Sequence, residues 1–190
     1  MPSGARSSWA IKSKRGSVEL NQISPNVIDA LIATEDHRFY DHWGMDWRRT
    51  FSSVVHTLRG DPQGGSTLTQ QLARNLFPEE IGRSRTLTRK LKEAITALKI
   101  EASYSKDEIL ETYLNTVPFL YNAYGIEMAA RTYFDKSADK LNVLESATLI
   151  GMLKGTAYYN PVLNPERAQA RRNTVLSQMV KRGKLEPEQF

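Results

Sequence analysis

The segment 87–103 has apolar residues on two opposite sides of one predicted helix, and this pattern restricts the folds open to the chain. One stripe consists of Leu87, Leu91, Ile95, Leu98 and Ala102, and the other contains Arg89, Glu93, Ala97 and Ile100. A helix that is apolar on two sides is usually enclosed by other elements. We therefore expect this helix in the middle of a domain, with the Glu93 carboxylate directed inward.

The same periodicity predicts a mainly α fold of about eight helices. Apolar residues recur three and four positions apart, and prolines, glycines and capping residues mark the ends of the segments. The predicted helices lie near residues 25–37, 47–58, 68–77, 87–103, 107–116, 126–134, 143–154 and 165–182. Residues 1–23 are expected to form an N-terminal arm, a linker or a small hairpin, and residues 24–190 to form one domain.

Composition excludes several classes of protein. The 190 residues contain no cysteine, which excludes disulfides and Cys-ligated metal sites. No stretch approaches the ~18–20 apolar residues of a transmembrane helix, and no signal peptide is visible. From the residues alone, the chain is either cytosolic or a domain of a larger protein. The net charge of +5 favours anionic partners such as nucleic acid, phosphates or a membrane surface, although a solvated basic surface is the simplest explanation.

Glu35 continues the apolar face of the predicted helix 25–37. Ile28, Leu31 and Ile32 occupy positions i, i+3 and i+4, and Glu35 follows at i+7. The pattern that buries the apolar residues therefore turns this carboxylate inward, where loss of hydration makes a carboxylate a better base. A glutamate at a helix end that pairs with a nearby arginine remains the alternative.

Two further features predict an anion site. In the segment 64–71, two glycines lead into a hydroxyl-rich helix start, where backbone N–H groups and the helix dipole favour negative charge. A basic run beside Glu93 follows, and its members are Arg83, Arg85, Arg89, Lys90 and Lys92, with Arg74 one helix earlier. Arginine binds phosphate through two parallel hydrogen bonds. Together the two features indicate a phosphate cradle, whereas each alone is also explained by a turn, a capped helix or a solvated face.

Five motifs occur in a fixed order between residues 35 and 136. They are Glu35-Asp36-x-x-Phe39-x-x-His42-x-Gly44, Gly64-Gly65-Ser66-Thr67-Leu68-Thr69-Gln70-Gln71, Arg89-Lys90-x-x-Glu93, Lys106-x-x-Ile109-Leu110-x-x-Tyr113-Leu114-Asn115, and a segment from Gly125 to Tyr133-Phe134. With these motifs the chain resembles the glycosyltransferase domain of bacterial peptidoglycan polymerases, the family 51 transglycosylases. That family includes monofunctional enzymes and class A penicillin-binding proteins.

The resemblance implies a lysozyme-like fold and an inverting transfer that joins the disaccharide units of lipid II into β-1,4-linked glycan. Glu35 is the implied general base, which takes the proton from the 4-hydroxyl of the acceptor. The cations implied to stabilise the leaving lipid pyrophosphate are Arg74, Arg85, Arg89 and Lys90. Glu93 is the second implied catalytic residue, which either orients these cations or holds a divalent ion, Mg²⁺ or Mn²⁺.

The remaining residues of the implied site are expected to contact the substrate. They are Asp36, Phe39, His42, Gly65, Ser66, Thr67, Gln70, Gln71, Asn75 and Lys154. The chain departs from the family pattern at two places. Arg74 stands where many members have lysine, which preserves the charge but changes the geometry. Residues 117–124 lack an arginine-glycine pair that is often found there.

The resemblance also implies partners and a location. Lipid II, the lipid-linked growing glycan and a membrane surface are the expected partners, with other cell-wall synthesis or division proteins as further candidates and no role for nucleic acid. Because lipid II is displayed outside the cytoplasm, we expect a peripheral domain at the extracytoplasmic face of the plasma membrane, with a membrane anchor before residue 1. Trp43, Met45 and Trp47 either form a membrane-dipping surface or belong to the core.

Two other functions remain open from the sequence. A lysozyme-like glycan hydrolase would also carry a glutamate at a helix end, but it would have no use for the phosphate cradle. A catalytically inactive module that binds nucleic acid or anionic lipid would explain the net charge. The spacing of His37, His42 and His56 fits no zinc pattern, and Ser103-x-x-Lys106 lacks the companion motifs of a penicillin-binding site.

Overall fold

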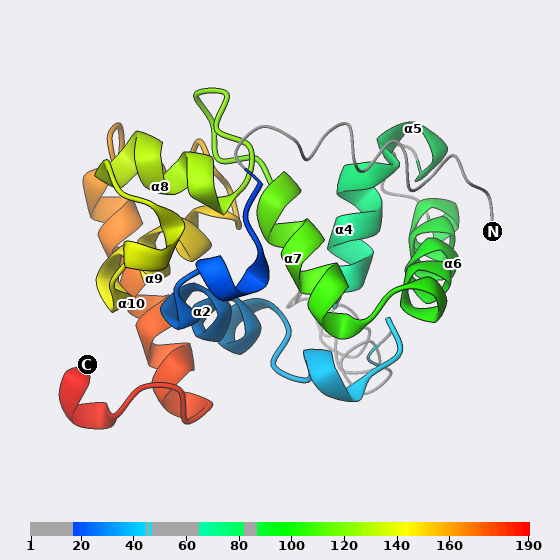
Figure 1. Ribbon diagram of the computed structural model, residues 1–190, viewed down its shortest axis with the longest axis horizontal. Coiled ribbons are helices and arrows are strands. Elements are labelled where there is room, and N and C mark those ends of the chain that lie inside the picture. Colours follow the sequence, from blue (N-terminus) through cyan, green and yellow to red (C-terminus); the bar gives the residue numbers. More distant parts are fainter. Residues whose placement is uncertain (1–16, 45, 47–64, 82–86) are drawn as a thin grey trace. The chain divides into compact units, whose positions relative to one another are not determined.

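The computed structural model describes residues 17–44, 46, 65–81 and 87–190, and these residues are predominantly helical (Figure 1). Within these ranges there is no strand, only an isolated bridge between Pro118 and Tyr124. The mainly α class is therefore confirmed. The helix predicted over 47–58 lies outside the described residues, and the domain boundary at residue 23 stays a prediction.

The chain divides into two compact units. Unit 1 comprises residues 1–37 and 113–190, and unit 2 comprises residues 38–112. The helix α7 (Lys106–Thr116) runs from unit 2 into unit 1. In the described part of the chain, none of the helices combines the length and apolar character that a membrane span requires.

Unit 1 is built around α2 (Pro25–Glu35), α9 (Val143–Met152) and α10 (Pro165–Lys181), which pack against one another. The apolar faces that the sequence predicted supply its core, since Leu31, Ile150 and Val175 are fully buried. Ser24 caps α2 by accepting a hydrogen bond from the Asn26 backbone N–H, and Pro25 occupies the first helical position, where its missing N–H costs nothing. The helix α8 (Ile126–Phe134) completes the long helices of this unit.

The start of α9 carries a capping box that also holds an ion pair. The Asn142 side chain accepts from the Glu145 backbone N–H, and the Glu145 carboxylate accepts from the Asn142 N–H at 3.0 Å and from Lys136 Nζ at 2.7 Å. Burial opposes ionisation of Glu145, but the hydrogen bonds from Lys136 and Asn142 outweigh it and lower the pKa of this carboxyl below 4.5. Ionised Glu145 therefore stabilises the folded chain.

This linkage makes a pH-dependent prediction. A lowered carboxyl pKa adds stability above the unfolded pKa, and that stability is lost as the pH falls through the folded pKa. We expect Glu145→Gln to lower the free energy of unfolding by about 1 kcal/mol at pH 7. Urea unfolding should show the difference at pH 7 and no difference at a pH well below 4.5. A difference of the same size at both pH values would contradict the proposed role of the Glu145 charge.

Unit 2 contains α4 (Leu68–Leu76), the short α5 (Pro78–Ile81) and α6 (Leu87–Ser103), together with a 3-10 turn at Phe39–Asp41. The helix α6 packs against α4 and α5 through the face that carries Glu93, Ala97 and Ile100, all of which are buried. This part of the prediction for segment 87–103 is confirmed.

The other stripe of α6 is not enclosed, and the expectation that this helix is sandwiched is wrong. Leu87 is 88% exposed, Leu91 61%, and Ile95 and Leu98 are each 45% exposed. Periodicity shows that a helix face is apolar, but it does not show what covers that face. The expectation failed because an apolar face that meets no other element of its own chain gives the same sequence pattern as a buried one.

Candidate active site

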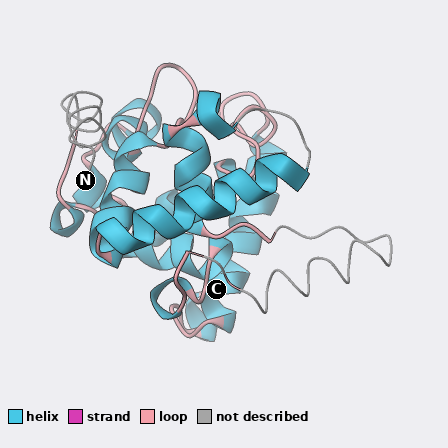
Figure 2. Cartoon of the chain, turned by 90° about the vertical axis from the view of Figure 1, so that its right-hand side faces the viewer, coloured by secondary structure: helices cyan, strands magenta, loops and turns pink. Residues whose placement is uncertain are grey.

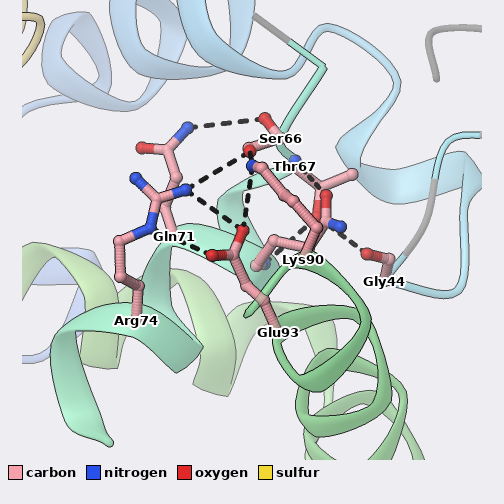
Figure 3. A network of polar contacts seen from close by, with 8 residues as sticks. Gly44, Ser66, Thr67, Gln71, Arg74, Lys90 and Glu93 are labelled. Atoms are coloured by element: carbon pink, nitrogen blue, oxygen red, sulfur yellow. Dashed lines mark hydrogen bonds and ion pairs between the residues drawn. The ribbon is translucent and has the colours of Figure 1, made fainter. Parts of the chain in front are cut away.

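A cluster of charged side chains surrounds Glu93 in unit 2 (Figure 3). Both carboxylate oxygens of Glu93 accept hydrogen bonds from Arg74, at 3.1 Å from Nε to Oε2 and at 3.1 Å from NH2 to Oε1. Lys90 Nζ lies 3.4 Å from Glu93 Oε1. Lys90 and Arg74 also donate to the Ser66 hydroxyl, at 2.7 and 3.3 Å. Two helices and the turn before α4 thus hold these four side chains in one place.

The charge of this cluster is unbalanced and its cations face water. The Glu93 side chain is completely buried, whereas the side chains of Arg74 and Lys90 are 38% and 46% exposed. Burial lowers the pKa of the Lys90 ammonium; Glu93 opposes this effect, and the nearby Arg74 and Arg89 add to it. A bound anion would relieve this excess of positive charge. The geometry therefore suits an anion such as phosphate or pyrophosphate.

The same geometry does not suit a divalent cation at Glu93. Its two oxygens already accept from Arg74 and Lys90, and a metal ion there would meet two positive groups. Among the described residues no cluster of three or more His, Asp or Glu side chains could hold a metal. These contacts favour the orienting role of Glu93 over metal binding.

The polar residues at the start of α4 are engaged in holding that start in place. Thr67 Oγ1 accepts from the Gln70 backbone N–H, and Gln70 Oε1 accepts from the Thr67 N–H at 2.7 Å. The Thr67 hydroxyl donates to the carbonyl of Gly44 at 2.8 Å, and Gln71 Nε2 donates to the carbonyl of Ser66 at 3.5 Å (Figure 3). Thr67 and Gln70 are buried. These bonds fix the backbone of Ser66, which presents its hydroxyl to the cations.

A second network in unit 2 involves Glu101 and Lys106, neither of which is a predicted site residue. Glu101 Oε1 accepts from Lys106 Nζ and from Thr69 Oγ1, each at 2.7 Å. Lys106 Nζ lies 3.4 Å from His42 Nδ1 and 4.6 Å from the centre of the buried Phe39 ring. The first, second and fourth motifs therefore meet at one ion pair. Only the presence of Lys106 in the fourth motif pointed to it.

Gly44 shows how tightly this turn packs on α6. Its φ is +93°, and a Cβ atom there would lie 2.9 Å from Glu101 Cγ and 3.1 Å from the carbonyl of Ala97. A side chain would be both strained and obstructed, so the glycine that closes the first motif is required by the packing. The Gly44 N–H donates to His42 Nδ1 at 3.0 Å, which places His42 in a structural contact.

Glu35 lies in unit 1, at the last position of α2. Its side chain is 16% exposed, and Oε1 lies 3.9 Å from NH2 of Arg171, a largely buried residue of α10. The carboxylate is therefore shielded from water on most sides, as the helical pattern predicted. A nearby arginine, which was the alternative, is present as well, at the outer limit of an ion pair. The role of Glu35 as a base stays a prediction.

The other predicted site residues lie in different surroundings. Asp36 is buried directly after α2, Asn75 and Lys154 are exposed, and Arg89 and Gly65 are partly buried. Trp43 is 78% exposed. Arg85 of the predicted site, and Met45 and Trp47 of the predicted membrane-dipping surface, lie outside the described residues. For Asp36, Asn75, Lys154, Arg89, Gly65 and Arg85, a contact with substrate stays a prediction, as does a membrane-dipping role for Trp43.

Comparison with known proteins identifies the class to which this helical fold with its basic cluster belongs. A family profile described as transglycosylase matches residues 5–180. The chain belongs to the transglycosylase family.

Individual relatives are penicillin-binding proteins. The chain is 45% identical over 179 residues to penicillin-binding protein 1A of Aquifex aeolicus and 46% identical over 179 residues to that of Escherichia coli. In both cases 93% of this chain is matched, but only 24% and 21% of the relative, so the chain spans a quarter or less of their length. The crystal structure of penicillin-binding protein 1A from Haemophilus influenzae is similar in fold, with a TM-score of 0.54 and 25% identity, and the match covers 93% of this chain and 17% of that chain.

Proposed function

We propose that this chain is a peptidoglycan glycosyltransferase that polymerises lipid II into β-1,4-linked glycan strands. The observation that carries the proposal is the cluster of Arg74, Lys90 and Ser66 around buried Glu93. A hydrolase cleaves a bond between two sugars and releases a sugar hydroxyl, which needs no site for multiple negative charges. A lipid pyrophosphate is a multiply charged leaving group, and the cluster matches that charge.

In the proposed reaction, Glu35 removes the proton from the 4-hydroxyl of the acceptor sugar. The oxygen attacks the anomeric carbon of the donor from the face opposite the pyrophosphate, and the bond from that carbon to the pyrophosphate oxygen breaks. The lipid pyrophosphate leaves with the bonding electrons, and the anomeric configuration is inverted. A positioned base typically contributes about 10²–10⁴-fold to such a step.

Arg74 and Lys90 stabilise the negative charge that develops on the leaving pyrophosphate. Fixed donors of this kind act best when they need no rearrangement during the reaction. Glu93 supplies that order, because it accepts two hydrogen bonds from Arg74 and lies within 3.4 Å of Lys90. Arg89, on the same helix, adds positive charge.

The lipid chain of this substrate remains in a membrane. The proposed enzyme therefore works at a membrane surface, on the extracytoplasmic side where lipid II is displayed. Its expected partners are lipid II and the lipid-linked growing glycan, and other cell-wall synthesis or division proteins are further candidates.

Inhibition by inorganic pyrophosphate tests the assignment of the cluster. The rate of polymer formation from lipid II should fall as pyrophosphate is added, because the added anion competes for Arg74 and Lys90. In Arg74→Gln the uninhibited rate should be lower by about 10²-fold, and the concentration of pyrophosphate needed for half inhibition should rise. Asn173→Gln, an exposed change on α10 in unit 1, serves as the control. Equal inhibition of the parent chain and Arg74→Gln would show that the cluster does not bind the leaving pyrophosphate.

A further inference from the structure

The outer side of α6 is an apolar surface that faces solvent. Leu87, Leu91, Ile95 and Leu98 follow one another along a single side of this helix, with exposed fractions of 88%, 61%, 45% and 45%. In Figure 2 the long helix nearest the viewer is α6, and no other described helix of unit 2 lies in front of it. Four adjacent large apolar side chains that are exposed to water indicate a surface that binds a partner. We call these four residues the α6 stripe.

Lysines border the α6 stripe. With about 3.6 residues per turn, Lys92 and Lys99 lie beside the edge of the stripe that Ile95 forms. Both lysines are exposed. A helix with leucines on one side and lysines along their border lies in the plane of a membrane interface, where the leucines enter the acyl boundary and the lysines meet anionic headgroups.

The α6 stripe and the cluster around Glu93 are on opposite sides of the same helix. Glu93 is on the buried face of α6 and holds Arg74 and Lys90, whereas the stripe is on the outer face. The two faces are separated by roughly one helix diameter, about 10–12 Å including side chains. A substrate whose lipid chain lies in the bilayer and whose pyrophosphate reaches these cations requires a membrane close to this helix.

We propose that the α6 stripe, with Lys92 and Lys99, is the surface by which this chain docks on an anionic lipid bilayer. The role of the docking in catalysis rests on the proposed function, but the docking itself does not depend on substrate. A second copy of the chain is a poorer occupant. A symmetric contact with antiparallel α6 helices would bring each pair of lysines close to its equivalents. In either orientation, four side chains offer much less than the ~800 Å² per partner of a stable interface.

Vesicle binding tests the proposal with the 190-residue chain. Sedimentation with vesicles of phosphatidylglycerol and phosphatidylcholine gives the partition coefficient of the parent chain and of Leu91→Gln/Leu98→Gln. We expect the double variant to bind at least about tenfold more weakly, with an unchanged circular dichroism spectrum because both side chains are exposed. Leu144→Gln, at a 51% exposed leucine of α9 in unit 1, is the matched control and should bind like the parent.

A charge variant separates the lysines from the leucines. Lys92→Gln/Lys99→Gln should weaken binding to the anionic vesicles and leave the weaker binding to pure phosphatidylcholine unchanged, because only the anionic surface attracts the lysines. Parent-like binding by the leucine variant would overturn the proposal. So would a dimer of the parent chain, measured by sedimentation equilibrium, that the leucine substitutions dissociate, because a second copy would then occupy the stripe.

Activity measurements separate this proposal from the function on which it rests. In detergent micelles the leucine variant should polymerise lipid II at the parent rate, whereas in vesicles its rate should fall with its binding. A chain that binds vesicles through the stripe but never polymerises lipid II would contradict the proposed function and leave the docking surface in place. A chain whose leucine variant polymerises lipid II equally in vesicles and micelles would contradict the docking role.

Discussion

Glu35→Gln will lower the rate of lipid II polymerisation by about 10²–10⁴-fold, the range that a general base contributes. Glutamine has nearly the same shape as glutamate, but its amide accepts no proton at neutral pH. The acceptor 4-hydroxyl then reacts without a base. The rate should be measured from the appearance of polymer by chromatography, at saturating lipid II, so that weaker binding does not imitate slower chemistry.

The fold should persist in Glu35→Gln. Arg171 NH2 lies 3.9 Å from Glu35 Oε1, which is too far for a strong hydrogen bond. We expect the free energy of unfolding to change by less than about 1 kcal/mol. Glu188→Gln, an exposed change near the C-terminus of the same unit, is the control for loss of one negative charge. A Glu35→Gln variant that keeps half or more of the parent rate would show that the base is elsewhere.

Glu93→Gln will reduce both activity and stability. The substitution removes the charge that accepts two hydrogen bonds from Arg74 and lies beside Lys90. The two cations and Arg89 then repel one another without a counter-charge. Hydrogen bonds to charged groups are worth about 1.5–3 kcal/mol, and the partial exposure of both cations reduces the loss, so we expect destabilisation by about 1–3 kcal/mol. The rate should fall by about 10²-fold, because the donors to the leaving group are no longer aligned.

Pyrophosphate distinguishes this explanation from simple damage to the fold. An added anion can replace the missing negative charge of Glu93, and a ligand that binds only the folded state raises its stability. Pyrophosphate should therefore raise the melting temperature of Glu93→Gln by more than that of the parent chain. Glu101→Gln, which breaks the ion pair between Glu101 of α6 and Lys106 of α7, should not gain this extra stabilisation. Equal shifts in all three chains would contradict the role of Glu93 as the counter-charge of the cluster.

The sequence was sufficient for the longer helices among the described residues and for part of the candidate site. Caps and apolar spacing placed α2 and α9 correctly, because the starts of these helices depend on local contacts. The Ser24 side chain accepts a hydrogen bond from the Asn26 N–H, and the Asn142 side chain accepts one from the Glu145 N–H. The grouping of Arg74 with Glu93 followed from the motifs. The burial of Glu93 followed from periodicity, since Ala97 and Ile100 share its face.

Other features depend on contacts between segments that are far apart in the sequence. The ion pair of Glu101 with Lys106 and its contact with His42 required the tertiary structure, because the spacing of five between the first two has no pairing rule in a helix. The N-cap role of Thr67 was one alternative that the sequence offered, and it is confirmed. The part of Gln70 in the same cap was not predicted, since a polar residue in a motif serves equally well as a cap or as a ligand. The exposure of the α6 stripe was missed because apolar periodicity does not identify the covering partner.

The conversion of lipid II by the unmodified chain is the most direct test of the central claim, that this chain forms glycosidic bonds at the expense of a lipid pyrophosphate. Purified lipid II should be incubated with the chain, and the products separated by chromatography, with glycan polymer and released lipid pyrophosphate quantified together. We predict that one lipid pyrophosphate is released for each new glycosidic bond. When finished glycan replaces lipid II as the substrate, we predict that it is not shortened. Cleavage of the finished glycan, without polymer from lipid II, would contradict the account and identify the chain as a hydrolase.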